Sequence, residues 1–163
     1  MDLLDRMLGN DQWATTQLLA LSRELTDAQL DQEFDIGHRT LRETFDHMIS
    51  VVDFWTGLMT GRPVPHDRTT QQYDRSLPAL IERHEQFSAS FAEFARRAQA
   101  EQRLVDTFVD HYDYRQTVGS TIIQVMLHNA LHRSEARHIL VRLGVPVRGD
   151  YDPQEWEHAT REF

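Results

Sequence analysis

The sequence predicts an all-α fold built from four long helices, and three observations lead to this prediction. Apolar residues recur at helical spacing in four segments, at residues 2–25, 40–60, 76–100 and 117–143. Residues that cap helices, and glycines or prolines that end them, stand at the borders of these segments. Most connections are modest and no boundary divides the 163 residues, so a single bundle domain over residues 1–163 is expected.

The first half of the chain contains two of these helices. Residues 2–25 carry a stripe of leucines, and the capping box Thr26-Asp27-Ala28-Gln29 predicts a short extra turn after it. A loop should follow at residues 34–39. A second capping box, Thr40-Leu41-Arg42-Glu43, should begin the second long helix, which ends at Gly61. Its apolar arc is wide enough for burial on more than one side, with rows at Leu41, Phe45, Met48, Val52 and Trp55, and at Val51, Phe54 and Leu58.

The second half is also mainly helical. A stripe of leucines and phenylalanines predicts a helix over residues 76–100. Residues 101–116 fit either an extended segment or a loop. The last long helix should cover residues 117–143, with Gly144 just beyond its end. Asp152-Pro153 is a typical helix start, so a short helix should follow in the tail.

The composition disfavours several classes of protein. Cysteine is absent, which removes disulfides, thiolate metal sites and a cysteine nucleophile. The net charge of −9 disfavours binding to nucleic-acid phosphates. No apolar run approaches the roughly 18 residues of a transmembrane helix, and the N-terminus lacks the features of a signal peptide. We therefore expect a soluble cytoplasmic protein that binds neither nucleic acid nor a membrane.

Histidine is unusually frequent, with nine residues, and two of them form a pair. His128 and His132 are four residues apart on the last predicted long helix, in a row that otherwise faces the core. At this spacing the Cβ atoms are about 6 Å apart, so both rings can bind one ion. Such a pair also arises by chance, and a core histidine is usually just hydrogen-bonded.

A third histidine favours a metal site. His47 lies in an apolar row of the second long helix, with Thr44, Val51, Phe54 and Leu58. Three inward-facing imidazoles on two helices are hard to satisfy by hydrogen bonds alone, whereas one divalent ion satisfies all three. The sequence therefore predicts one divalent metal ion on His47, His128 and His132.

Two more specific metal patterns fail. A metalloprotease helix needs Glu after the first histidine of the pair, where Asn129 stands. A di-iron bundle needs two Glu-x-x-His motifs and two further glutamates, and one of the two motifs here lies in the tail. The other histidines carry no metal prediction: His38, His66 and His111 are in predicted loops, His138 and His158 are off the metal row, and His84 fits a hydrogen-bonded core residue.

Nearly the whole chain resembles the DinB-like (DinB/YfiT) superfamily. Three stretches carry the resemblance: Asn10-Asp11-Gln12-Trp13-Ala14 with Leu18-Leu19; Thr40-Leu41-Arg42-Glu43-Thr44-Phe45-Asp46-His47 with Asp53-Phe54-Trp55; and His128-Asn129-Ala130-Leu131-His132-Arg133-Ser134-Glu135 with Leu143-Gly144. Many members have a doubled histidine before the arginine and Gly-Gln after it. Here Leu131 and Ser134-Glu135 stand at those positions, so the surroundings of the ligands should differ.

This resemblance implies an up-down-down-up four-helix bundle, with nickel, zinc or iron on the histidines that match His47, His128 and His132. It also implies a homodimer, which the wide apolar arc of the second long helix supports. Members with known activity include transferases and isomerases that use low-molecular-weight thiols such as bacillithiol or mycothiol. Many others are described only as metal-dependent hydrolases.

The residues leave the function open between an enzyme and a non-catalytic module. Three imidazoles leave a position for substrate on the ion, and the absence of cysteine means that any thiolate must come from a cosubstrate. Thiol S-transfer and hydrolysis both fit, and the substrate would be a small molecule. Glu135 and Glu43 could orient the ligands, and Arg133, Tyr112 and Tyr114 could contact substrate. A fourth protein ligand, which the sequence does not identify, would favour a non-catalytic metal-binding or interaction module.

Overall fold

A computed structural model describes residues 1–64 and 73–161, and four long helices form its body. These helices are α1 (Leu3–Leu21), α3 (Leu41–Thr60), α4 (Leu77–Ala100) and α5 (Val118–Arg142). The shorter elements are α2 (Asp27–Leu30), the 3-10 helix η2 (Arg103–Val105), strands β1 (Thr107–Val109) and β2 (Arg115–Thr117), and α6 (Pro153–Thr160). The prediction of an all-α bundle is confirmed.

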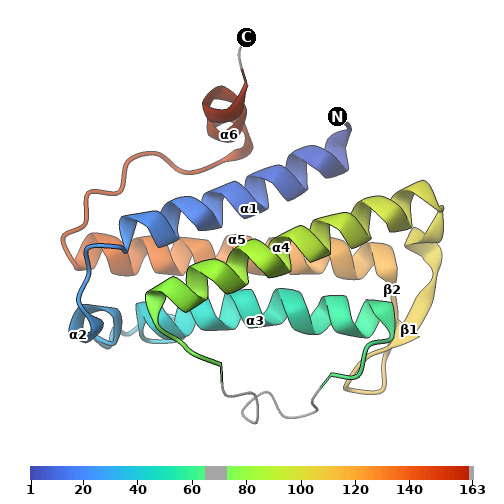
Figure 1. Ribbon diagram of the computed structural model, residues 1–163, viewed down its shortest axis with the longest axis horizontal. Helices are drawn as coiled ribbons and strands as arrows, with labels where there is room; N and C mark the ends of the chain where they lie inside the picture. Colours follow the sequence, from blue (N-terminus) through green and yellow to red (C-terminus); the bar gives the residue numbers. More distant parts are fainter. Residues whose placement is uncertain (65–72, 162–163) are drawn as a thin grey trace.

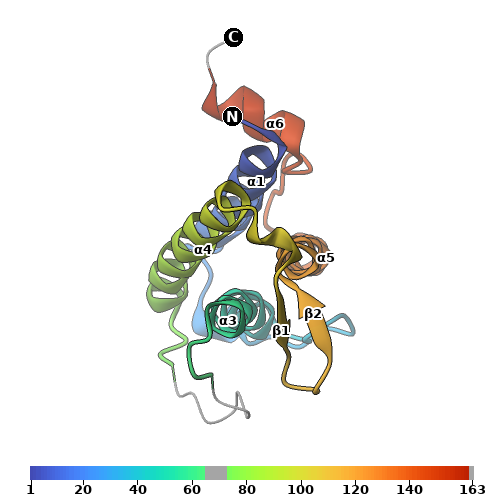
Figure 2. The same ribbon diagram turned by 90° about the vertical axis from the view of Figure 1, so that its right-hand side faces the viewer.

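The four long helices lie side by side, as the end-on view in Figure 2 shows, with α3 beside both α4 and α5. In Figure 1, α1 and α5 run toward the end where α2 lies, and α3 and α4 run the opposite way. The β1–β2 hairpin packs beside α3 and α5, and α6 lies outside the bundle against α1. The α3–α5 pair therefore has the loop after α2 at one end and the hairpin at the other.

Local signals explain where the helices begin and end. The Thr40 hydroxyl accepts a hydrogen bond from the Glu43 N–H, which caps α3, and Gly61 ends α3 with φ of 73°. The hydroxyl of Thr117 caps α5 in the same way. One boundary prediction was wrong, because α1 ends at Leu21 and not at residue 25. There the backbone tightens, because the Ser22 N–H donates to the Leu19 carbonyl at 3.1 Å and the Leu25 N–H to the Ser22 carbonyl at 3.0 Å.

The ambiguous segment before α5 is a two-stranded antiparallel hairpin, in which Phe108 faces Gln116. Asp110 holds its turn together. One oxygen of the Asp110 carboxylate accepts the N–H groups of Tyr112 and Tyr114, and the other accepts the Gln116 amide. These hydrogen bonds lower the pKa of Asp110 against the opposing effect of burial. The hairpin thus presents its tyrosines from a fixed turn.

The core extends along the whole bundle in two clusters that meet around α3. Phe45, Leu80 and Ile139 are fully buried in the cluster near α2, and Phe91 and Val125 in the cluster near the hairpin. Burying side chains of this size contributes about 1.5–3 kcal/mol each. The predicted burial of α3 on several sides is confirmed, and α4, α5 and the hairpin of the same chain supply the contacts.

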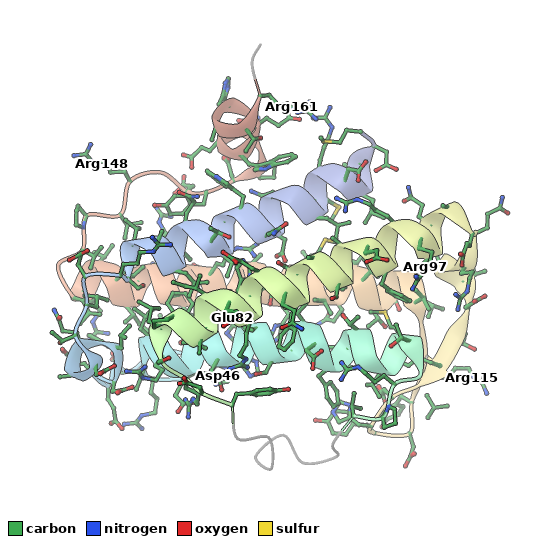
Figure 3. The ribbon with its side chains drawn as sticks, viewed as in Figure 1. Asp46, Glu82, Arg97, Arg115, Arg148 and Arg161 are labelled. Atoms are coloured by element: carbon green, nitrogen blue, oxygen red, sulfur yellow. The ribbon has the colours of Figure 1, made fainter. Side chains whose placement is uncertain are left out.

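Two further features fix the helices relative to one another. Arg83 of α4 donates to Asp46 and to Ser50 of α3, both at 2.8 Å, and Asp46 is labelled in Figure 3. On the outer side, a Cβ on Gly9 of α1 would overlap the ring of Trp156, so glycine allows α6 to approach. In the described part of the chain, no helix combines the length and hydrophobicity that crossing a bilayer requires.

Candidate metal centre

The three histidines predicted as ligands lie together between α3 and α5. The Nε2 atom of His128 is 3.0 Å from Nε2 of His47 and 3.1 Å from Nε2 of His132. The ring centres of His47 and His132 are 4.8 Å apart, so each ring faces the other two. One turn of α5 and a single position of α3 are enough to build this cluster.

Glu135 sets the state of one of these rings. Its carboxylate lies 2.6 Å from Nδ1 of His132, one turn along α5. A carboxylate there accepts a hydrogen bond from the Nδ1–H group, and this tautomer leaves the Nε2 lone pair free to bind a metal ion. The sequence suggested both Glu135 and Glu43 for such a role, and Glu43 instead forms an ion pair with Arg75.

The loop before α3 closes against the same carboxylate. Gly37 has a φ of 47°, and a Cβ built on it would overlap the carboxylate of Glu135. Glycine is needed there both for its backbone conformation and for this close approach. The loop between α2 and α3 is thereby packed onto α5 beside His132.

His38, to which the sequence assigned no role, reaches the cluster from this loop. Its ring centre lies 3.9 Å from that of His47 and 5.0 Å from that of His132. The ligand nitrogens of His38, His47 and His132 all lie within 4.8 Å of one another. Helical periodicity could not find His38, because its placement depends on how the loop folds back onto α5. The available signal was Gly37 directly before it.

The donor set fits a divalent ion. Ligands at about 2.1 Å from one metal lie roughly 3.0 Å apart in octahedral and 3.4 Å apart in tetrahedral coordination. The Nε2 contacts of 3.0 and 3.1 Å match this range. A proton on one Nε2 atom can serve only one neighbour well, whereas a cation between them attracts every lone pair. Imidazole ligands without thiolate suit zinc, nickel, iron and copper.

A cavity adjoins the cluster on the side of the hairpin. It has a volume of about 180 Å³ and is lined by residues of α3, α5 and the hairpin turn: Val51, Trp55, His111, Tyr112, Gln124, Val125 and His128. A neighbouring cavity of about 410 Å³ shares Trp55, Tyr112 and Gln124 and adds Tyr114. Of the two tyrosines suggested by the sequence, Tyr112 shares the small cavity with His128, and Tyr114 lines only the neighbouring cavity. The small cavity opens to the surface and is lined by His128, so it would admit a small molecule beside that histidine.

Arg133, the other suggested substrate contact, is used elsewhere. It forms a buried ion pair with Asp11 of α1 and lies 3.3 Å from the Thr15 hydroxyl. Asn129 donates to the second oxygen of Asp11 at 3.2 Å. Arg133 and Asn129 thus join α5 to α1, and the neighbouring histidines of the same helix face α3.

Three other histidines that the structure describes have different surroundings from those of the cluster. His84 is buried, and its Nε2 lies 3.1 Å from the Gln12 carbonyl and 3.2 Å from the Thr16 hydroxyl, as expected of a hydrogen-bonded core residue. Burial lowers the pKa of His84, so it is neutral in the folded protein at neutral pH. His138 is exposed on α5, and His111 lines the small cavity. His66 lies outside the described residues.

Comparisons with known proteins address the family. The family model of the DinB superfamily matches residues 11–136, which include α1 from Asp11 onward and reach the Glu135 region of α5. The chain belongs to the DinB superfamily. This superfamily is generally metal-binding. The described residues include a histidine group, made of His38, His47 and His132, that could hold an ion. The resemblance drawn from the sequence motifs is therefore confirmed.

A solved structure supports the same fold. This DinB-superfamily chain is similar to the crystal structure of a DinB-like protein from Bacillus cereus ATCC 10987, with a TM-score of 0.62 and 21% sequence identity. The match covers 85% of this chain and 89% of that one. No curated protein matches the chain. The comparisons establish the family and the fold.

Proposed function

We propose that this chain is a metal-dependent enzyme in which His47, His128 and His132 hold one divalent ion beside a small-molecule cavity. The observation that carries the proposal is that Nε2 of His128 lies 3.0 and 3.1 Å from Nε2 of His47 and His132, and that His128 also lines this cavity. The ion is nickel, zinc or iron. Three protein ligands with neighbouring free volume are typical of catalytic rather than structural zinc sites.

The first candidate reaction is transfer of a low-molecular-weight thiol to an electrophile. When bound, the ion supplies a Lewis acid that lowers the pKa of a coordinated thiol or water. The thiol sulfur bonds to the electrophilic carbon, the leaving group departs with the bonding electrons, and the thiol proton passes to solvent. Because the chain has no cysteine, the sulfur must come from a cosubstrate.

The residues of the chain position these reactants. Glu135 orients the ring of His132, and the hydrogen bonds of Asp110 fix the hairpin turn that carries Tyr112 and Tyr114. Trp55 gives the cavity an aromatic wall on α3. Hydrolysis is the second candidate, because a volume of about 180 Å³ also has room for several waters at roughly 30 Å³ each.

A panel of thiols with a generic electrophile tests the proposal. Metal-loaded wild type and His138→Ala should conjugate at the same rate, and His47→Ala should fall to the uncatalysed background. His138 is an exposed histidine on α5, so its loss controls for removing an imidazole. Metal-dependent ester or amide cleavage without conjugation would select hydrolysis. Neither activity, with metal still bound, would select a non-catalytic metal-binding module.

We also propose that the chain forms a homodimer through α5. The apolar arc of α3 is covered within the chain, so it no longer supports a dimer. Ile123, Leu127 and Leu131 instead form a row at spacing of four on α5, with exposed fractions of 50%, 59% and 59%. Sedimentation should show twice the 19.1 kDa of one chain, and Leu127→Glu should release the monomer. A wild-type monomer at high concentration would refute the dimer.

A further inference from the structure

His38 differs from the other histidines of the cluster in the element that carries it. His47, His128 and His132 project from helices, whereas His38 lies in the loop between α2 and α3. Its ring stacks against that of His47 at an interplanar angle of 32° and stands near His132. His38 therefore adjoins two of the three proposed ligands, His47 and His132, whose Nε2 atoms also lie beside that of His128.

We propose that His38 is a fourth, loop-borne ligand of the ion held by His47, His128 and His132, and that an incoming ligand replaces it. This inference rests on the proposed metal site, and the departure of His38 from the ion provides the open position that the proposed enzyme needs. The proposal gives the loop the function of releasing a ligand. A histidine on a packed helix cannot do this as easily, because the packing of the helix holds it in place. A ligand on a loop can leave the ion without disturbing the bundle.

The loop is built to hold its histidine at this place. The Phe34 N–H donates to the Arg39 carbonyl at 2.7 Å, and the Arg39 N–H donates to the Ile36 carbonyl at 2.8 Å. Gly37 and Arg39, on either side of His38, have φ values of 47° and 70°. A left-handed arginine is uncommon, and such residues cluster at functional sites. Gly37 packs against Glu135, which itself orients His132.

The remaining distance is short enough for a side chain to cross. Two tetrahedral ligands of one ion lie about 3.4 Å apart. The ligand nitrogens of His38, His47 and His132 lie within 4.8 Å of one another, so a closure of at most about 1.4 Å brings His38 to tetrahedral spacing from His47 and His132. Rotation of one imidazole about its side-chain torsions moves its nitrogens by more than this. His38 reaches the ion without any change in the helices.

Cobalt titration of protein purified without a histidine tag tests the proposal. Wild type should bind one equivalent with the intense visible absorption of a four-coordinate ion. His38→Ala should still bind one equivalent, about 10–100-fold more weakly and with weaker absorption, because water enters. Added imidazole should restore the wild-type spectrum of His38→Ala and leave that of His138→Ala unchanged. An unchanged affinity and spectrum in His38→Ala would overturn the role of His38.

A second measurement does not depend on a variant. In zinc-loaded protein with ¹⁵N-labelled histidine, four rings rather than three should show metal-shifted nitrogen resonances. Three shifted rings would reject His38 as a ligand and leave the proposed three-histidine site standing. No metal bound by wild type, or full binding by His128→Ala, would reject the proposed site and this inference together.

Discussion

Two interfaces of the bundle contain inward-facing histidines, and the chain treats them differently. At the α1–α4 interface, His84 of α4 meets a carbonyl and a hydroxyl of α1, and nearby Asp11 of α1 forms an ion pair with Arg133 of α5. At the α3–α5 interface, Nε2 atoms face one another. The first arrangement is satisfied by protein groups, and the second is satisfied best by a cation. Whether an inward-facing histidine is a core residue or a metal ligand therefore depends on the groups that its ring nitrogens meet, and not on how deeply it is buried.

The largest effect should come from breaking the ion pair on the α1 side. Asp11→Ala leaves Arg133 buried without its counter-charge, so the free energy of unfolding should fall by about 3–5 kcal/mol. The matched control is Asp35→Ala, which breaks the exposed ion pair with Arg142 and should leave the free energy of unfolding almost unchanged. Urea unfolding measures both. Equal small losses of unfolding free energy in the two variants would mean that the Asp11–Arg133 ion pair does not hold α1 to α5.

Bound metal should stabilise the protein through the histidines between α3 and α5, independently of the ion pair between α1 and α5. Zinc at 100 times its dissociation constant should add about 2.7 kcal/mol, which raises Tm by about 5–11 °C in a chain of this size. His128→Ala should lose this shift, because it removes the Nε2 that contacts both other rings. Asp11→Ala should keep the shift at its lower Tm. A shift that persists in His128→Ala would place the ion elsewhere.

Removing the partner of a ligand should have a smaller effect than removing the ligand. Glu135→Gln loses the negative charge beside Nδ1 of His132, so zinc affinity should fall about 10–100-fold. Glu43→Gln is the control, because the ion-pair partner of Glu43 is Arg75 and not a histidine of the cluster. Competition with a chromophoric chelator measures both variants. Equal affinities in the two variants would show that Glu135 does not support the site.

The smallest effect should be the pH dependence that His84 contributes. Burial lowers the pKa of His84 in the folded state, and unfolding restores it to about 6.5. Above that value both states are neutral and the stability is complete. As pH falls below it, the unfolded state takes up the proton first, so stability decreases. In chelator-treated protein, wild type should therefore lose more stability than His84→Gln between pH 7.5 and 5.5, by urea unfolding.

The difference between the two interfaces also shows how far sequence reasoning reaches. Helical spacing placed His47, His128 and His132 in core-facing rows, and their meeting follows once two helices pack along those rows. Glu135 was within reach of the same reasoning, since it lies one turn from His132. His38 was not, because the path of the loop depends on Gly37 packing against Glu135. The ion pair of Arg133 was out of reach for a similar reason, since its partner Asp11 lies on α1, far away in sequence.

The most direct test of the central claim is the metal content of three proteins purified without a tag. Wild type and His84→Ala should each carry about one equivalent of a divalent ion after loading, and His128→Ala less than about a tenth. The comparison is matched, because each variant removes one inward-facing imidazole from the bundle. One equivalent in His128→Ala, or less than about a tenth in loaded wild type, would contradict the account.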